Sequence, residues 1–250
     1  MSRRSTGGVV EHVKTLVYAI LIAVGIRTIA FEPFNIPSGS MIPTLLVGDY
    51  LFVSKYSYGY SRFSMPLAPP LFTGRIFGRV PARGDVAVFK LPRDTSTDYI
   101  KRIIGLPGDH IQMRSGQLYV NGERVQRRDA GQYTAEGDGP AMQLKRYSET
   151  LPGSGDHPAK QHFILKADDN QPLDNTQEFV IPAGHVFAMG DNRDNSLDSR
   201  VLNAVGFIPI ENLVGRAEFI WFSVNATAPF WEIWEWPFEI RWSRLFTGIN

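Results

Sequence analysis

A long apolar stretch near the start of the chain restricts its fold more than any other feature. Residues 13–31 are mostly apolar, the core at residues 16–26 carries no charge, and Lys14 and Arg27 lie near the two ends. A helix needs about 20 apolar residues to cross a bilayer, and the stretch reaches that length if both cations extend toward the interfaces. The sequence therefore predicts a transmembrane helix over residues 13–31.

A cleavable signal peptide is the alternative, because a basic start and a short apolar core are typical of one. Residues 27–33 are bulky and charged, however, and offer no cleavage site between small residues. An uncleaved anchor is favoured on these grounds. Arg3, Arg4 and Lys14 precede or begin the apolar stretch, so the positive-inside rule predicts a cytoplasmic tail at residues 1–12 and places residues 32 onward outside the cytoplasm.

Size and composition narrow the class of protein. A chain of 250 residues can form one large β-rich domain or two small ones. The formal net charge of +1 argues against a nucleic-acid-binding protein, which usually has a strongly basic face. The chain contains no cysteine, which excludes disulfides, thiolate zinc sites and cysteine nucleophiles.

Beyond residue 31 the sequence is typical of β-structure. Asn121 and Gly122 separate two short β-prone runs, and this dipeptide is the strongest short-range signal for a hairpin. No helical period longer than two turns follows the anchor, apart from a short one near residues 211–214. A strand that runs into a turn is predicted over residues 50–60, and the other predicted strands lie at residues 85–90, 99–104, 117–120, 123–125, 179–181 and 186–189.

Three segments depart from this pattern. Residues 61–84 are rich in Pro and Gly among bulky apolar residues, and predict an irregular or hairpin excursion whose exposed hydrophobic side chains mark a partner or membrane surface. Residues 127–178 are polar and predict an inserted lobe of loops and short strands. Residues 230–242 hold four of the five tryptophans, which favours a segment dipping into the membrane interface over a final pair of core strands.

A candidate nucleophile lies shortly after the anchor. Residues 37–45 read PSGSMIPTL, so Ser38 and Ser40 flank Gly39 and prolines bound the run. Gly39 allows a sharp turn with positive φ, and the prolines make the flanking backbone rigid and extended. This pattern suits a nucleophile beside an oxyanion hole, and it also suits an ordinary surface turn.

A serine nucleophile needs a base to take its proton. None of the five histidines has a convincing partner in the sequence, so a Ser-His-Asp triad has little support. Residues 191–198 are rich in oxygen ligands, but an EF-hand starting at Asp191 fails at its third, sixth and twelfth positions. We therefore expect no metal site there.

Lys101 is the remaining candidate base. On a strand it shares a face with apolar Tyr99 and Ile103, and burial there lowers its pKa from about 10.4. Arg102 points the other way, and its nearby charge disfavours a second ammonium. The alternative is an amphipathic edge strand with two solvated cations.

Four segments, in this order, resemble the successive sequence boxes of bacterial type I signal peptidases. They are residues 37–45, 83–86 (RGDV), 99–109 (YIKRIIGLPGD) and 190–200 (GDNRDNSLDSR). The resemblance implies a mainly β fold: a strongly bent antiparallel, barrel-like catalytic domain over residues 32–126 and 179–250, interrupted by the variable lobe. It also implies a single-pass protein of the bacterial inner membrane, with its catalytic domain on the extracytoplasmic side. The activity that the resemblance implies is the removal of N-terminal signal peptides from secreted preproteins after small residues, without a cofactor.

The same resemblance assigns roles to individual residues. Ser40 matches the nucleophile and Lys101 the neutral general base, while Ser38 and the Ser40 amide match the oxyanion hole. Ser196 matches a serine that orients the lysine, and Asp198 and Arg200 match a structural ion pair. The pocket for small side chains is expected to be lined by Phe34, Ile36, Met41, Leu45, Tyr99 and Ile100.

The implied partners are preprotein signal peptides and membrane lipid, the latter through the anchor and the tryptophan-rich segment, and no nucleic acid. Two other functions remain open. Self-cleaving Ser/Lys repressors share the dyad, but they are soluble and carry a helical DNA-binding domain that this sequence lacks. The second alternative function is a catalytically silent envelope scaffold, which would recruit partners through residues 61–80 and the tryptophan-rich segment.

Overall fold

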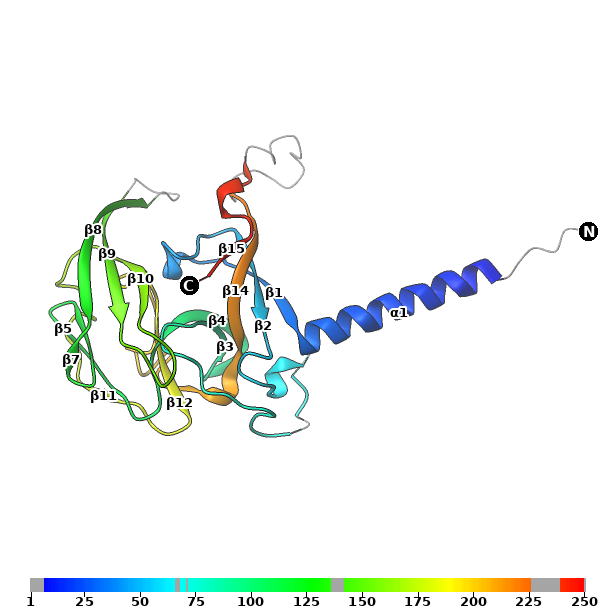
Figure 1. Ribbon diagram of the computed structural model, residues 1–250, viewed down its shortest axis with the longest axis horizontal. Helices are drawn as coiled ribbons and strands as arrows, with labels where there is room; N and C mark the ends of the chain where they lie inside the picture. The colour runs from blue at the N-terminus through cyan, green and yellow to red at the C-terminus, as the bar shows by residue number, and fades with distance from the viewer. Residues whose placement is uncertain (1–6, 66–67, 71, 136–141, 226–238, 250) are drawn as a thin grey trace, which may run out of the picture.

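The computed structural model describes residues 7–65, 68–70, 72–135, 142–225 and 239–249. Helix α1 (Gly7–Ile29) projects away from a body of β-sheets (Figure 1). Its span Val10–Ile29 has a mean hydropathy of 1.5 and no buried portion, so it is long and apolar enough to cross a membrane. The helix starts six residues before the predicted stretch and ends two residues before its end, because Phe31 already belongs to the first strand.

The main sheet has eight strands, and every pairing in it is antiparallel. Pro33, which cannot donate to a ladder, is tolerated because β1 is an edge strand. In sheet order the strands are β1 (Phe31–Asn35), β2 (Asp49–Ser54), β14 (Leu213–Ser223), β3 (Val86–Leu91), β4 (Asp94–Gly105), β12 (His185–Met189) and β13 (Ile208–Pro209), with β15 (Thr247–Gly248) beside β14.

This sheet is strongly bent. β1 and β4 stand first and fifth in the strand order, yet Phe34 of β1 and Ile100 of β4 line the same cavity. The sheet therefore curves until its first and fifth strands approach each other, and the expected mainly β, strongly bent antiparallel fold is confirmed. Its concave side encloses a core of Ile36, Met41, Leu45, Leu51, Val53, Val86, Val88, Val214, Ala217 and Ile220.

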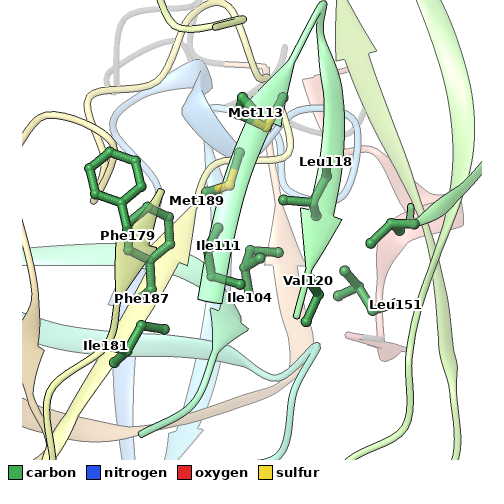
Figure 2. Close-up of a cluster of buried hydrophobic side chains, with 11 residues drawn as sticks. Ile104, Ile111, Met113, Leu118, Val120, Leu151, Phe179, Ile181, Phe187 and Met189 are labelled. Atoms are coloured by element: carbon green, nitrogen blue, oxygen red, sulfur yellow. The ribbon is translucent and has the colours of Figure 1, made fainter. Parts of the chain in front are cut away.

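A second sheet contains the predicted hairpin. Asn121 and Gly122 have φ values of 54° and 82°, as a tight two-residue hairpin turn requires, and this prediction is confirmed. The sheet has the order β11 (Phe179–Val180), β5 (His110–Arg114), β6 (Gln117–Val120), β7 (Glu123–Arg124). Figure 2 shows the core that joins it to the main sheet, in which Ile111 and Leu118 pack with Ile104 and Phe187.

The polar segment after residue 126 forms a third sheet, of order β10-β9-β8, on the side of the β body away from α1 (Figure 1). Its strands are β8 (Gln126–Ala135), β9 (Met142–Leu151) and β10 (Lys160–Lys166). Two of the three have ten residues, so the expectation of short strands is wrong. An antiparallel sheet can have one face in water and the other buried, so a polar composition is compatible with it. Neighbouring residues show the two faces, since Phe163 is exposed and Ile164 is fully buried.

Several other sequence-based assignments can be compared with the structure. The strand running into a turn that was predicted over residues 50–60 is confirmed, because β2 ends at Ser54 and a turn follows. The short helical period near residues 211–214 corresponds to a 3₁₀ turn at Ile210–Asn212, which leads directly into the long central strand β14 that the pattern did not reveal. Exposed hydrophobic side chains in the 61–84 excursion are confirmed at Ile76, Phe77 and Val80. Most of the tryptophan-rich segment falls in residues 226–238, outside the described residues.

Candidate active site

Ser40 lies in a 3₁₀ turn, Gly39–Met41, that follows edge strand β1. Gly39 does not adopt positive φ there, contrary to the expectation of a left-handed pivot. Close packing favours a glycine here instead, because a Cβ at this position would lie 3.0 Å from Ile42 Cδ1. The Ile42–Pro43 peptide bond that closes the turn is cis.

Lys101, in β4, brings its amine to this turn. Its Nζ lies 2.7 Å from Ser40 Oγ and donates a hydrogen bond of 3.0 Å to the Ile100 carbonyl. Lys101 is 4% exposed, and the neighbouring Arg102 is fully buried. The alternative of a strand with two solvated cations is therefore wrong, and β4 presents a buried amine to a nearly buried hydroxyl.

Burial lowers the pKa of Lys101 to about 8, against the opposing pull of the Asp198 and Asp191 carboxylates. The Arg102 charge, expected to contribute, is not among the causes of this shift. It is neutralised by Asp191, whose Oδ2 lies 2.7 Å from Arg102 Nη2. Desolvation alone therefore makes the lysine a usable base near pH 8.

The two serines of the turn lie side by side. Ser38 Oγ is 3.5 Å from Ser40 Oγ, and the Ser38 side chain is on the exposed side. A hydroxyl in this place can reach an oxygen that develops charge on a substrate attacked by Ser40.

Among the residues that the structure describes, no hydrogen bond joins Ser196 to Lys101. Its Oγ is buried and has no partner at hydrogen-bonding geometry, although it is close enough to Asp198 to be among the weaker influences that lower the pKa of that carboxyl. Gly190 lies between Ser196 and Ser40: a Cβ on it would collide with Ser196 Oγ and lie 2.5 Å from the Ser40 carbonyl oxygen. Its orienting role stays a prediction.

The loop that carries Ser196 also holds the turn that carries Ser40 in place. The Asn192 amide donates to the Ser40 carbonyl (3.1 Å), and Asn192 Nδ2 donates to the Gly39 carbonyl (3.1 Å). Thr44 Oγ1 donates to Asp191 Oδ2 at 2.5 Å. The sequence pattern assigned no role to these residues, although Asp191 and Asn192 lie inside the 190–200 box.

Asp198 and Arg200 form a fully buried ion pair, with Nε–Oδ1 and Nη2–Oδ2 distances of 2.8 Å each. Burial favours the neutral carboxyl, but the Arg200 charge and hydrogen bonds outweigh it and hold the pKa of Asp198 below its usual value. Asp194, in the same loop, pairs with Lys166 at 2.9 Å. The carboxylates of this loop are thus engaged with cations.

Side chains of the third sheet contact the loop of the candidate site. The polar composition of residues 127–178 gave no indication of this contact. Glu149 of β9 accepts a hydrogen bond from Arg193 Nη1 at 3.0 Å, and both side chains are buried. His162 of β10 lies 3.5 Å from the same carboxylate, and burial keeps its pKa well below the usual value. Arg193 follows Asn192, so the lobe anchors the loop that positions Ser40.

Two cavities lie along β4, and the larger one contains Ser40 and Lys101 in its wall. One of about 530 Å³ is lined by Pro37, Ser38, Gly39, Ser40, Thr97, Asp98, Tyr99, Ile100, Lys101, Asn195 and Leu197. A smaller one of about 200 Å³ is lined by Phe34, Asn35, Ile36, Pro37, Val88, Asp98, Tyr99 and Ile100. Of the expected pocket residues, Phe34, Ile36, Tyr99 and Ile100 line these cavities. Met41 and Leu45 do not, because both are fully buried in the core cluster of the main sheet.

A family model described as "Signal peptidase, peptidase S26" matches residues 9–222. The chain belongs to this family. Curated relatives include signal peptidase I of Rickettsia typhi, 41% identical over 96% of this chain and 93% of that protein. Signal peptidase I of Rickettsia conorii is also 41% identical, over 93% of this chain and 90% of that protein.

Among solved structures, a signal peptidase I from Enterococcus faecalis is 22% identical, with a TM-score of 0.31, over 55% of this chain and 97% of that one. The family and the curated relatives make this chain a serine peptidase, a hydrolase whose activity is the removal of signal peptides. With helix α1, the signal peptidase is a membrane-anchored protein.

Proposed function

We propose that this signal peptidase cuts preproteins after small residues with Ser40 as nucleophile and neutral Lys101 as general base. The observation that supports this assignment is the 2.7 Å approach of Lys101 Nζ to Ser40 Oγ in a site whose burial lowers the pKa of the lysine to about 8. A hydroxyl becomes an effective nucleophile only when such a base can take its proton.

The reaction follows from these positions. Lys101 takes the Ser40 proton as Oγ attacks the scissile carbonyl carbon, and the resulting oxyanion is stabilised by the Ser38 hydroxyl and the Ser40 amide. The carbon–nitrogen bond then breaks, and Lys101 delivers its proton to the leaving amine. Water attacks the acyl-enzyme, again with Lys101 as base, and releases the signal peptide and regenerates Ser40.

The edges of two strands support an extended substrate. β1 is the edge strand of the main sheet, and β12 pairs with β4 only along Arg102–Gly105. This leaves the preceding part of β4 open on that side, where both cavities lie. A preprotein segment can add there as a strand, with main-chain hydrogen bonds for affinity and the small cavity for selecting small side chains.

Ser196 is included as an orienting residue for Lys101 in the substrate-bound enzyme. Its buried Oγ has no partner, while the amine of Lys101 must point at Ser40 throughout the reaction. Ser196→Ala should lower kcat with little change in KM, and Ser196→Thr should retain activity. An equal loss in both variants would remove Ser196 from the mechanism.

The anchor sets the location. With Arg3, Arg4 and Lys14 at the cytoplasmic end, the catalytic domain faces the extracytoplasmic side of the bacterial inner membrane. Signal peptides and surrounding lipid are then the partners. Protease added to sealed right-side-out spheroplasts should digest the β domain, and protection of the domain would overturn this orientation.

A serine-acylating penem probe tests the chemical assignment. The full chain in detergent should be labelled, and peptide mass spectrometry should place the adduct on Ser40. Ser40→Ala should not be labelled at this position. A catalytically silent scaffold would not be acylated at all, and labelling of a different serine would move the nucleophile elsewhere.

A further inference from the structure

The anchor joins the sheet without a linker. Helix α1 ends at Ile29 and β1 begins at Phe31 (Figure 1). A flexible tether between a membrane helix and an enzyme domain would allow a range of separations, growing with the number of linker residues. Here the chain passes directly from helix to strand.

Glu32 forms the electrostatic centre of this junction. Its carboxylate accepts a hydrogen bond of 2.6 Å from Arg27 Nη2 in the last turn of α1, and it pairs at 2.9 Å with Lys55 Nζ just beyond β2. The Lys55 side chain is 2% exposed and Glu32 is 13% exposed, whereas Arg27 is 60% exposed. One carboxylate thus connects the membrane helix to a buried cation of the catalytic domain.

Two further bonds engage backbone carbonyls at the end of the helix. Tyr60 OH donates to the Ile29 carbonyl at 2.8 Å, and the Lys55 amide donates to the Ala30 carbonyl at 3.0 Å. Carbonyls at a helix C-terminus have no partner within their own helix. The domain supplies these partners, which fixes the direction in which α1 leaves it.

The junction is rigidly connected to the nucleophile. β1 pairs with β2 from Phe31 to Asn35, and Ser40 follows five residues later in a turn held by Asn192. Five strand residues span roughly 17 Å. The distance from the end of the anchor to Ser40 is therefore built into the fold.

A further cavity lies beside this junction. It has a volume of about 290 Å³, and Arg27 and Glu32 contribute to its wall. Phe34 and Asp98 line both this cavity and the smaller cavity between β1 and β4.

We infer that Arg27, Glu32, Lys55 and Tyr60 form a positioning device that holds Ser40 at a set height above the membrane. The device selects, among chemically equivalent peptide bonds of a membrane-anchored preprotein, the bond at the matching distance from the apolar segment. The four residues are positioning residues, and they act through β1 rather than on the substrate. The inference rests on the proposed function of Ser40.

A two-site substrate tests the inference with the full chain reconstituted in liposomes. The preprotein carries two identical small-residue sites about six residues apart, or roughly 20 Å of extended chain, on the extracytoplasmic side of its apolar segment. A soluble peptide contains the same two sites without that segment. The readout is the ratio of cleavage at the two sites, measured by mass spectrometry of the products.

The test variant combines Arg27→Gln with Tyr60→Phe. It leaves the Glu32–Lys55 pair intact, so the buried lysine keeps its counter-ion. Because small misplacements of reacting groups can change rates about 100-fold, we expect wild type to favour one site about tenfold and the double variant to favour it less than about threefold. Both enzymes should cut the soluble peptide at the same rate and ratio.

Two control variants sharpen the result. Lys14→Gln removes one positive charge and an ion pair from the same helix, away from the junction, and should preserve the wild-type ratio. Tyr60→Phe with Arg27→Lys retains the ion pair and should restore most of the preference. An unchanged ratio in the double variant, no preference in wild type, or an equal change with the soluble peptide would overturn the inference. Failure of wild type to cut either substrate would instead overturn the proposed function.

Discussion

Lys101 Nζ and Ser40 Oγ lie 2.7 Å apart, although 61 residues separate them in the chain. The bent sheet brings them together, since it curves β4 toward the turn that follows β1. The approach places a desolvated amine against the hydroxyl that it is proposed to activate. The predictions below depend on this approach and on the loop contacts that maintain it.

Activity should depend on pH through Lys101. With its pKa near 8, the lysine is protonated and inactive as a base in acid, so kcat/KM should rise with pH and level off above about 9. At pH 6 roughly one hundredth of the lysine is neutral, and activity should be about one hundredth of the plateau. Initial rates on a soluble peptide between pH 6 and 10 measure this, and a flat profile would exclude Lys101 as the base.

The same burial should cost stability. The folded pKa of Lys101 is lower than that of the unfolded chain, so the charged form is penalised in the fold; the penalty is full below about pH 8 and disappears above about pH 10.5. Lys101→Met should therefore raise the free energy of unfolding by roughly 2–3 kcal/mol at pH 7 and by little at pH 10.5. Denaturant titrations of both proteins in detergent at the two pH values provide the measurement. A gain that does not shrink with pH would contradict the assigned cause.

Gly190 should tolerate no side chain. An added Cβ would collide with Ser196 Oγ and press on the Ser40 carbonyl, and displacing the nucleophile by about 1 Å can lower a rate about 100-fold. Gly190→Ala should thus reduce kcat by about this factor while the protein remains folded. Gly248→Ala is the matched control, because nothing lies within 4 Å of a Cβ there. Similar rates in the two variants would show that the turn has room to move.

Glu149 should support the site from the third sheet. Removing its charge leaves Arg193 buried without a counter-ion, which costs about 3–5 kcal/mol. Glu149→Gln should lower the free energy of unfolding by this amount and also slow cleavage, because Arg193 adjoins Asn192. Asp169→Asn breaks the ion pair with Arg127, in which Asp169 is 38% exposed, and should change stability by less than about 1 kcal/mol. If both variants behave alike, the lobe does not anchor the site loop.

Local patterns predicted the features that local forces determine. The Asn121-Gly122 turn needs only its own backbone preference, and the burial of Lys101 follows from its apolar strand neighbours. The partner of Arg102 is 89 residues away at Asp191, and no period or turn signal carries that information. The sequence alone could therefore not decide whether the Arg102 side chain is buried or exposed to solvent.

Tertiary contacts also explain the other errors. The family resemblance implied Met41 and Leu45 as pocket residues, but both side chains pack in the core of the main sheet. Glu149 and His162 lie in the polar lobe, to which the sequence pattern assigned no role in the site. They are buried because the third sheet packs that face against the 190–200 loop.

The most direct test of the dyad is the rate at which the folded full-length enzyme cuts a membrane-anchored preprotein, compared between wild type and Ser40→Ala at pH 9. Circular dichroism establishes that the variant is folded. We expect rapid cleavage by wild type and no cleavage above the uncatalysed background by Ser40→Ala. Cleavage at a comparable rate by Ser40→Ala would contradict the account.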